Sequence, residues 1–147
     1  MSDANFQIRK LEFEELRSVV NWAAEEGWNP GLSDAEIFFN TDPDGFFGAF
    51  LDGRLSGAIS AVRYGHEFAF VGLFIVRPEL RGGLLGPALG KKALERLKDV
   101  NIGVDGVERK IKNYESYGFK MAHYNIRHQG LSFKTKTPSK NSIISIL

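Results

Sequence analysis

The spacing of hydrophobic residues changes several times along the chain, and each change predicts a new element. In residues 6–12, Phe6 and Ile8 alternate with polar side chains, which is typical of a strand. Residues 13–27 instead carry apolar side chains at helical spacing, and Gly27 suits the position that follows a helix. The chain is therefore expected to open with a strand and an amphipathic helix.

A short second helix is expected next, between two loops. Residues 28–31 have the composition of a turn, with a proline followed by a glycine. Ser33 and Glu36 have the spacing of a capping box, which predicts that a helix begins there. Residues 42–45 (Asp-Pro-Asp-Gly) predict the loop that ends this helix.

Three apolar runs follow, at residues 46–51, 54–63 and 67–76. Asp52 and Gly53 separate the first two, and Asp-Gly between apolar runs is a strong signal of a β-hairpin. A proline lies just beyond the third run and ends it. The pattern predicts three strands in an antiparallel meander.

Residues 85–98 predict a helix with one apolar stripe facing a core. Pro87 is tolerated only in the first turn of a helix, which fixes where this one starts. The stripe consists of Leu85, Leu89, Ala93 and Leu97. Later elements are expected at residues 100–104 (strand), 109–117 (short helix) and 119–127 (strand).

The predicted order is β α α β β β α β α β, an α/β fold in a single domain. An antiparallel meander is followed by a strand–helix–strand crossover, and such a crossover pairs its strands in parallel, which makes the sheet mixed. Residues 1–130 are expected to form this domain. Residues 131–147 predict no clear element, and we interpret them as a tail.

Composition excludes several classes of protein. The 147 residues carry a net charge of +1, so the electrostatic basis of non-specific nucleic-acid binding is missing and no nucleic-acid partner is expected. There is no cysteine, which rules out disulfides, a thiolate metal site and a cysteine nucleophile. No metal cofactor is expected. The chain shows no apolar run of about 20 residues and no secretory leader, so we expect a cytoplasmic protein without a membrane partner.

Residues 73–86 (LFIVRPELRGGLLG) carry the most chemical information. A buried strand stops at a proline, and Arg81, Gly82 and Gly83 then lead directly into a helix. Glycines let the backbone approach a ligand, the first turn of a helix offers free N–H donors, and an arginine matches phosphate geometry. This combination suits a diphosphate. Spacing alone leaves a second interpretation open, a tight strand-to-helix turn that binds nothing.

The segment LFIVRPELRGGLLGPALGKKALERL resembles the acyl-CoA-binding segment of the Gcn5-related N-acetyltransferase (GNAT) superfamily. In that family a strand and a Val-x-Pro sequence precede Arg/Gln-x-x-Gly-x-Gly/Ala at the start of a helix. A second match is Tyr114 with Gly118 and Phe119, which resembles the family's Tyr-x-x-x-Gly-Phe element. The resemblance covers roughly residues 6–130. Leu84 departs from it, because the family has its second glycine there.

The resemblance implies acetyl-CoA as cosubstrate. Its pantetheine arm would run along the strand before the turn, and its pyrophosphate would bind the N–H groups of the turn. The implied cofactor-binding residues are Phe74, Ile75 and Val76 on the strand, and Arg81, Gly82, Gly83, Leu84, Leu85 and Gly86 in the turn.

The resemblance also implies a chemical step, the attack of a neutral amine on the thioester. A backbone N–H near Ile75 or Val76 would stabilise the oxyanion. Tyr114 would protonate the leaving thiolate. Glu67 is the nearest acidic candidate for a general base, and a solvated strand end is the other interpretation of that residue. His66 and His123 are alternatives for the base.

The acceptor is expected to be a primary amine on a small molecule or a peptide. Trp28, Asn29 and Phe47 are the candidates for shaping its pocket, because the loop between the first two helices covers that side in the family. The apolar end IISIL suggests a homodimer through strand addition. A non-catalytic acyl-CoA-binding or regulatory module is the competing hypothesis, motivated by Leu84 and by the lack of an obvious base.

Overall fold

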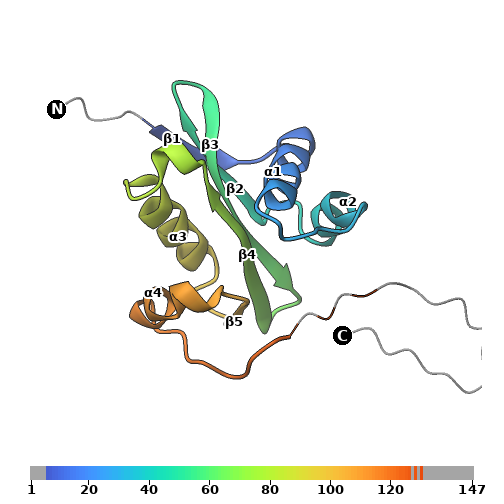
Figure 1. Cartoon of the computed structure of the whole chain (residues 1–147), viewed down its shortest axis with the longest axis vertical. Coiled ribbons are helices and arrows are strands. Elements are labelled where there is room, and N and C mark those ends of the chain that lie inside the picture. Colours follow the sequence, from blue (N-terminus) through green and yellow to red (C-terminus); the bar gives the residue numbers. More distant parts are fainter. Residues whose placement is uncertain (1–5, 127, 129, 131–147) are drawn as a thin grey trace, which may run out of the picture. The chain divides into compact units, whose positions relative to one another are not determined.

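The computed structural model describes residues 6–126, 128 and 130. These residues form two compact units that meet between Val107 and Glu108. Figure 1 shows both units in sequence colours. Each unit is described here by itself.

The first unit contains a five-stranded sheet in the order β1-β2-β3-β4-β5. The first three pairs of neighbours are antiparallel, and β4 and β5 are parallel. This confirms the predicted meander and its parallel crossover. The strands are β1 (Phe6–Lys10), β2 (Phe46–Leu51), β3 (Arg54–Tyr64), β4 (Phe68–Val76) and β5 (Asn101–Val104).

Helices cover both faces of this sheet (Figure 1). Helices α1 (Phe13–Glu25) and α2 (Asp34–Thr41) lie on one face, and α3 (Leu85–Arg96) lies on the other. A single 3₁₀ turn, Pro78–Leu80, joins β4 to the segment that precedes α3. The buried residues fall into two clusters, one under α1 and α2 and one under α3.

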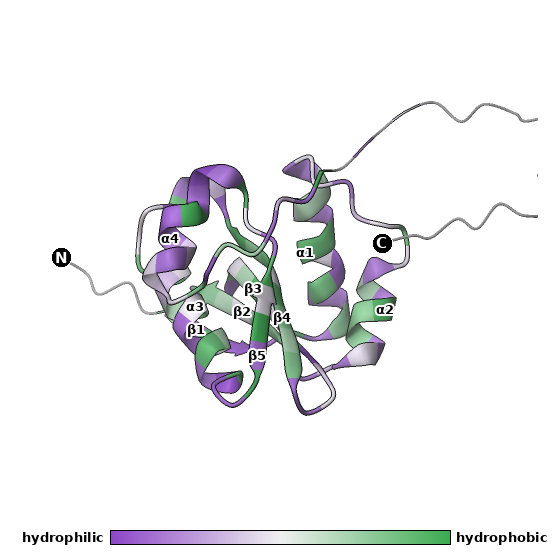
Figure 2. Ribbon diagram, turned by 90° about the horizontal axis from the view of Figure 1, so that it is seen from below, coloured by the Kyte–Doolittle hydropathy of each residue, from purple (hydrophilic) through white to green (hydrophobic). Residues whose placement is uncertain are grey.

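The apolar stripe predicted on α3 is its buried face. Leu89 and Leu97 are fully buried, and Leu85 and Ala93 nearly so. Burying a leucine side chain contributes roughly 1.5–3 kcal/mol, so this stripe holds α3 against the sheet. In Figure 2 the ribbons of α1 and α2 carry both hydrophilic and hydrophobic colours, as expected for helices with one buried face.

The hairpin between β2 and β3 confirms the prediction made from Asp52 and Gly53. Both residues have positive φ, 48° and 76°. Two consecutive residues with positive φ form the turn that matches the right-handed twist of the flanking strands. Leu51 and Arg54 are therefore paired directly across it.

The first helix ends as predicted and the second begins differently. Gly27 has a φ of 79°, and the Trp28 N–H donates to the Ala23 carbonyl at 3.0 Å, which is the Schellman geometry. The predicted capping box at Ser33 is wrong. Ser33 has a ψ of 8° instead of the extended backbone an N-cap needs, and its side chain caps nothing. The Asp34 carboxylate instead accepts the Gly31 N–H at 2.8 Å.

The second unit begins with a 3₁₀ turn, Glu108–Lys110, and α4 (Ile111–Ser116), where a short helix is predicted. The strand predicted at 119–127 is not formed over 119–126. A strand needs a partner for its backbone groups and a face to bury. Met121, Tyr124 and Ile126 are instead about half to three-quarters exposed. Residue 127 and the predicted tail, with its IISIL end, lie outside the described residues.

Within the described ranges, every helix is too short or too polar to cross a lipid bilayer.

Candidate functional site

The register of β4 changes in the middle of the strand. Ser60 pairs with Gly72 and Ala58 pairs with Ile75, so Leu73 and Phe74 stand opposite the single residue Ile59. This is a β-bulge, and Leu73 takes a φ of 43° there. A left-handed conformation costs a leucine about 1–2 kcal/mol. The extra residue leaves peptide groups of the bulge outside the ladder with β3.

The other edge of β4 is open beyond the bulge. β5 pairs with residues 68–71 of β4 and ends at Val104, so no described strand lies beside 72–76 on that side. The Arg77 N–H donates to the Ser56 carbonyl at 3.0 Å. Since antiparallel pairs alternate, the neighbouring residue Val76 turns its N–H and C=O away from β3, toward the open edge. Ile75, one residue earlier, turns its groups toward Ala58 on β3.

The turn between Pro78 and α3 presents a run of free backbone donors. No described residue accepts a hydrogen bond from the N–H groups of residues 82–86. The Ala88 N–H makes the first helical hydrogen bond, to the Leu84 carbonyl at 3.1 Å. Residues 82–84 are exposed, so water reaches these donors. Free donors and the positive end of the helix dipole form a site for an anion.

The three glycines of this turn differ in whether the fold itself requires a glycine at that position. Gly82 has a φ of 82°, a conformation that side chains disfavour. A Cβ on Gly83 would stand 3.5 Å from the nearest atom, the Leu80 carbonyl oxygen, which is an ordinary contact. A Cβ on Gly86 would stand 3.9 Å from the Phe74 ring. Backbone conformation therefore accounts for Gly82, whereas neither φ nor close packing against the described residues requires a glycine at 83 or 86.

The Arg81 side chain is held by the protein. Its Nε–H donates to the Val76 carbonyl at 2.8 Å. Its guanidinium forms an ion pair with Glu26, the residue that follows α1. Arg81, which the sequence predicts as a phosphate-binding residue, therefore contacts two protein groups in this structure.

Tyr114 lies on α4, in the second unit, where a local motif fixes its position. Gly118 has a φ of 91°, and the Phe119 N–H donates to the Tyr114 carbonyl at 3.2 Å, a second Schellman geometry. The two rings meet edge to face with centroids 6.1 Å apart. Burial raises the pKa of the Tyr114 phenol above its usual value of 10.0. The hydroxyl thus stays protonated, as a proton donor must.

The model of the acetyltransferase (GNAT) family matches residues 7–119. The chain belongs to this family. The match spans the bulged strand, the open turn and Tyr114, and it confirms the predicted family and fold class.

Relatives agree with this assignment. Holothin acyltransferase of Pseudoalteromonas sp. (strain SANK 73390) is 35% identical over 116 residues, which are 79% of this chain and 39% of that protein. A solved structure from Pyrococcus horikoshii, described as that of an acetyltransferase, has a TM-score of 0.69 at 22% identity and covers 82% of this chain and 45% of its own. The chain thus spans less than half the length of both proteins.

A second similar structure was solved with acetyl-CoA. It comes from Clostridium acetobutylicum, with a TM-score of 0.64 and 14% identity, and covers 85% of this chain and 96% of its own. At such identities the likeness of both solved structures shows the GNAT fold.

The structure does not bring Glu67 close to the bulge. Glu67 is exposed and directly precedes β4. Six residues separate it from Leu73, about 20 Å along a strand. His66 is exposed beside it, and His123 lies in the second unit. Within the first unit, neither Glu67 nor His66 therefore lies at the bulge.

The acceptor candidates fall on two faces of the GNAT sheet. Trp28 and Asn29 lie in the connection between α1 and α2, and Asn29 has a φ of 50°. Phe47 is buried in the other cluster, under α3. Because side chains alternate between the two faces along β2, Phe46 and not Phe47 lies on the face that α1 covers. The structure therefore does not bring Phe47 together with Trp28 and Asn29.

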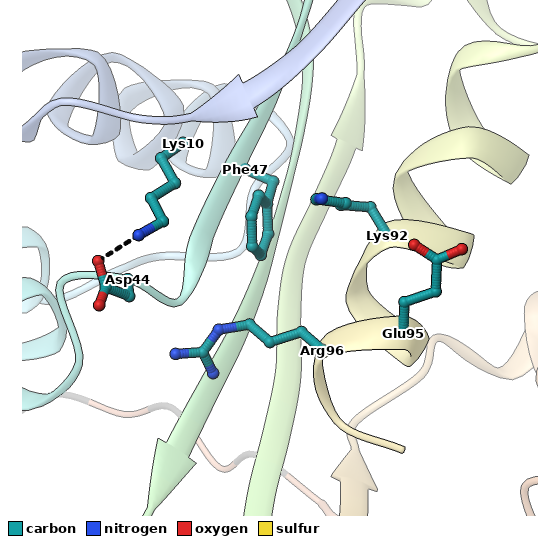
Figure 3. Close-up of a pocket in the computed structure, with 6 residues that line it drawn as sticks. All are labelled: Lys10, Asp44, Phe47, Lys92, Glu95 and Arg96. Atoms are coloured by element: carbon teal, nitrogen blue, oxygen red, sulfur yellow. Dashed lines mark hydrogen bonds and ion pairs between the residues drawn. The ribbon is translucent and has the colours of Figure 1, made fainter.

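An open hollow of about 420 Å³ lies at the far end of α3 (Figure 3). Phe47 lines it, and the Lys92 ammonium lies 5.7 Å from the centre of the Phe47 ring. The other cations are paired, because Lys10 contacts Asp44 at 2.6 Å and Arg96 contacts Asp42 at 3.0 Å. Ten residues of helix, about 15 Å, separate Leu85 from Glu95, which also lines the hollow. We assign it no role in cofactor binding.

Two features of the site had no usable signal in the sequence. Leucine has no preference for positive φ, so the residue type at position 73 did not predict the bulge. Glu26 lies 55 residues before Arg81, and only the fold brings them together.

Proposed function

We propose that this chain is an N-acetyltransferase that moves the acetyl group of acetyl-CoA to a primary amine. The observation that carries the proposal is the run of N–H groups at residues 82–86, which have no acceptor among the described residues and lie beside a strand edge that no described strand covers. In this proposal the pyrophosphate accepts hydrogen bonds from those N–H groups. The pantetheine arm lies along 72–76 as an added strand, bonded to the outward peptide groups of Val76.

The thioester then lies at the bulge. The backbone N–H groups of Leu73 and Phe74, two residues without a paired residue in the ladder with β3, are the donors proposed to stabilise the oxyanion. A preorganised donor of this kind is worth about 3–4 kcal/mol in other acyl-transfer enzymes. The acceptor nitrogen forms a bond to the carbonyl carbon and gives its proton to solvent. The carbon–sulfur bond breaks, and the Tyr114 hydroxyl gives its proton to the departing thiolate.

The acceptor is proposed to approach from the side of Trp28 and Asn29. Trp28 is partly exposed, at 36%, in the loop that follows α1. Holothin, named in the similar acyltransferase, is the first acceptor to test on this chain, together with small amines and peptides. No side chain is proposed as general base, since Glu67 lies far along β4.

Leu84 favours a second candidate, an acyl-CoA-binding module without catalysis. Leu84 stands where the family has a glycine, and its side chain is 74% exposed beside the free donors. A bulky residue there hinders close approach of a thioester cofactor to the backbone.

Two measurements on the wild-type chain distinguish these functions. Calorimetry with acetyl-CoA reports binding, and release of free thiol over the acceptor panel reports transfer. An acetyltransferase binds acetyl-CoA and releases thiol with at least one acceptor. A binding module gives heat without thiol release. Absence of binding contradicts both.

A further inference from the structure

Two arginines of the β4–α3 connection reach across to the end of α1. Arg81 forms its ion pair with Glu26, which directly follows the helix. The Arg77 guanidinium lies 5.7 Å from the centre of the Trp22 ring, within cation–π distance. Segments more than 50 residues apart are thus tied together at the mouth of the proposed cofactor site.

Arg81 donates a hydrogen bond to a backbone carbonyl, that of Val76, which the proposed function also requires. The Val76 carbonyl faces the open edge of β4 and accepts the Arg81 Nε–H at 2.8 Å. A pantetheine arm lying along this edge requires the same carbonyl for one of its own amide donors. Arg81 and the arm therefore compete for one acceptor.

We infer that Glu26 holds Arg81 as a latch across the open edge of β4, and that acyl-CoA opens this latch when it binds. The latch consists of Arg81, the Glu26 carboxylate and the Val76 carbonyl. This inference rests on the proposed binding of acyl-CoA. On opening, phosphate oxygens replace Glu26 as partners of the guanidinium, and a pantetheine N–H replaces Arg81 at Val76.

Exposure sets the strength of the latch. The Arg81 side chain is 45% exposed and that of Glu26 24%, so solvent screens their attraction. An ion pair of this kind changes an equilibrium by about two- to fivefold. The latch therefore opens readily, and its effect is on affinity for the cofactor.

Glu26→Gln tests the latch, because it removes the charge that holds Arg81 and keeps the size of the side chain. Glu25→Gln is the matched control. Glu25 is the neighbouring carboxylate, is exposed, and has no partner among the described residues, so both variants change the net charge equally. Calorimetry with CoA should give a dissociation constant two- to fivefold lower for Glu26→Gln than for Glu25→Gln. Glu26→Asp, with a shorter reach, should shift it in the same direction by less.

A double variant shows whether Glu26 acts through Arg81. In an Arg81→Gln background, Glu26→Gln should change CoA affinity no more than Glu25→Gln does. A gain that persists there, or a Glu26→Gln affinity equal to or weaker than the control, overturns the latch while leaving acyl-CoA binding intact. If neither the wild type nor any variant binds CoA, the latch and the proposed function both fail.

Discussion

The two ends of α3 make a useful comparison. At the N-terminal end, the N–H groups of residues 82–86 have no acceptor among the described residues. At the C-terminal end a cavity of about 420 Å³ is lined by Lys10, Lys92 and Arg96. Two of these cations already form ion pairs, Lys10 with Asp44 and Arg96 with Asp42.

Unmet hydrogen-bonding capacity, and not volume, is therefore the reason why we propose the N-terminal end as the cofactor site. Exposed charges paired with one another gain little from a new ligand, because binding must first break the existing pair. Free N–H groups at a helix N-terminus lose only water when an anion arrives. The predictions below challenge this comparison, beginning with the largest effect.

Tyr114→Phe tests whether the proposed chemical step can be separated from binding of the cofactor. Loss of the proton donor should lower kcat by roughly 10²- to 10⁴-fold, the usual contribution of general acid catalysis. The dissociation constant for acetyl-CoA should stay near that of the wild type. Thiol release and calorimetry measure the two quantities. A variant that binds poorly but turns over normally would contradict the assigned role.

The pH dependence of the same enzyme follows from the raised pKa of Tyr114. A general acid must be protonated, so the rate falls as the pH rises through its pKa. Burial places that fall above the ordinary tyrosine value of about 10. kcat should therefore show no loss attributable to Tyr114 between pH 7 and 9, and a falling limb in that range that disappears in Tyr114→Phe would be contrary evidence.

A new carboxylate at each end of α3 addresses the comparison itself. Gly83→Glu has room to fold, and its carboxylate would stand among the free donors and repel a diphosphate. CoA affinity should fall by about 100-fold, of the order expected for like charges a few ångströms apart at a protein surface. Lys92→Glu, the control at the opposite end, introduces the same negative group and should shift affinity by less than about twofold, as measured by calorimetry. Equal losses in both variants would remove the distinction between the ends.

Alanine at the two adjacent glycines gives the smallest effect. Gly82→Ala forces a side chain into positive φ and should lower the free energy of unfolding by about 1 kcal/mol. Gly83→Ala should leave it within about 0.5 kcal/mol of the wild type, because its Cβ meets nothing closer than 3.5 Å. Urea unfolding measures both. A larger loss of unfolding free energy in Gly83→Ala would mean that the fold itself requires a glycine at position 83, as it does at 82.

Elements whose pattern repeats over many residues were predictable from the sequence. The stripe from Leu85 to Leu97 fixed α3, and Asp52 with Gly53 fixed the first hairpin, because burial and turn chemistry act locally. The open turn followed from Gly82 and Gly83 for the same reason.

Features that depend on tertiary context were not predictable. The alternation of side chains along β2 predicts two faces but not which of them α1 covers. Phe47 was therefore grouped with Trp28 and Asn29, although it packs under α3. The strand expected at 119–127 has no partner strand over the described residues 119–126. The Arg81–Glu26 pair joins distant segments, which no local signal reports.

Amide NMR during a titration with acetyl-CoA tests the central claim most directly. The account predicts that the ¹H–¹⁵N signals of Gly82, Gly83 and Gly86 move first and furthest, as their N–H groups bind phosphate oxygens. Signals of Phe47 and Lys92 should stay in place. Saturable shifts around Phe47 and Lys92, with the three glycine signals unmoved, would contradict it.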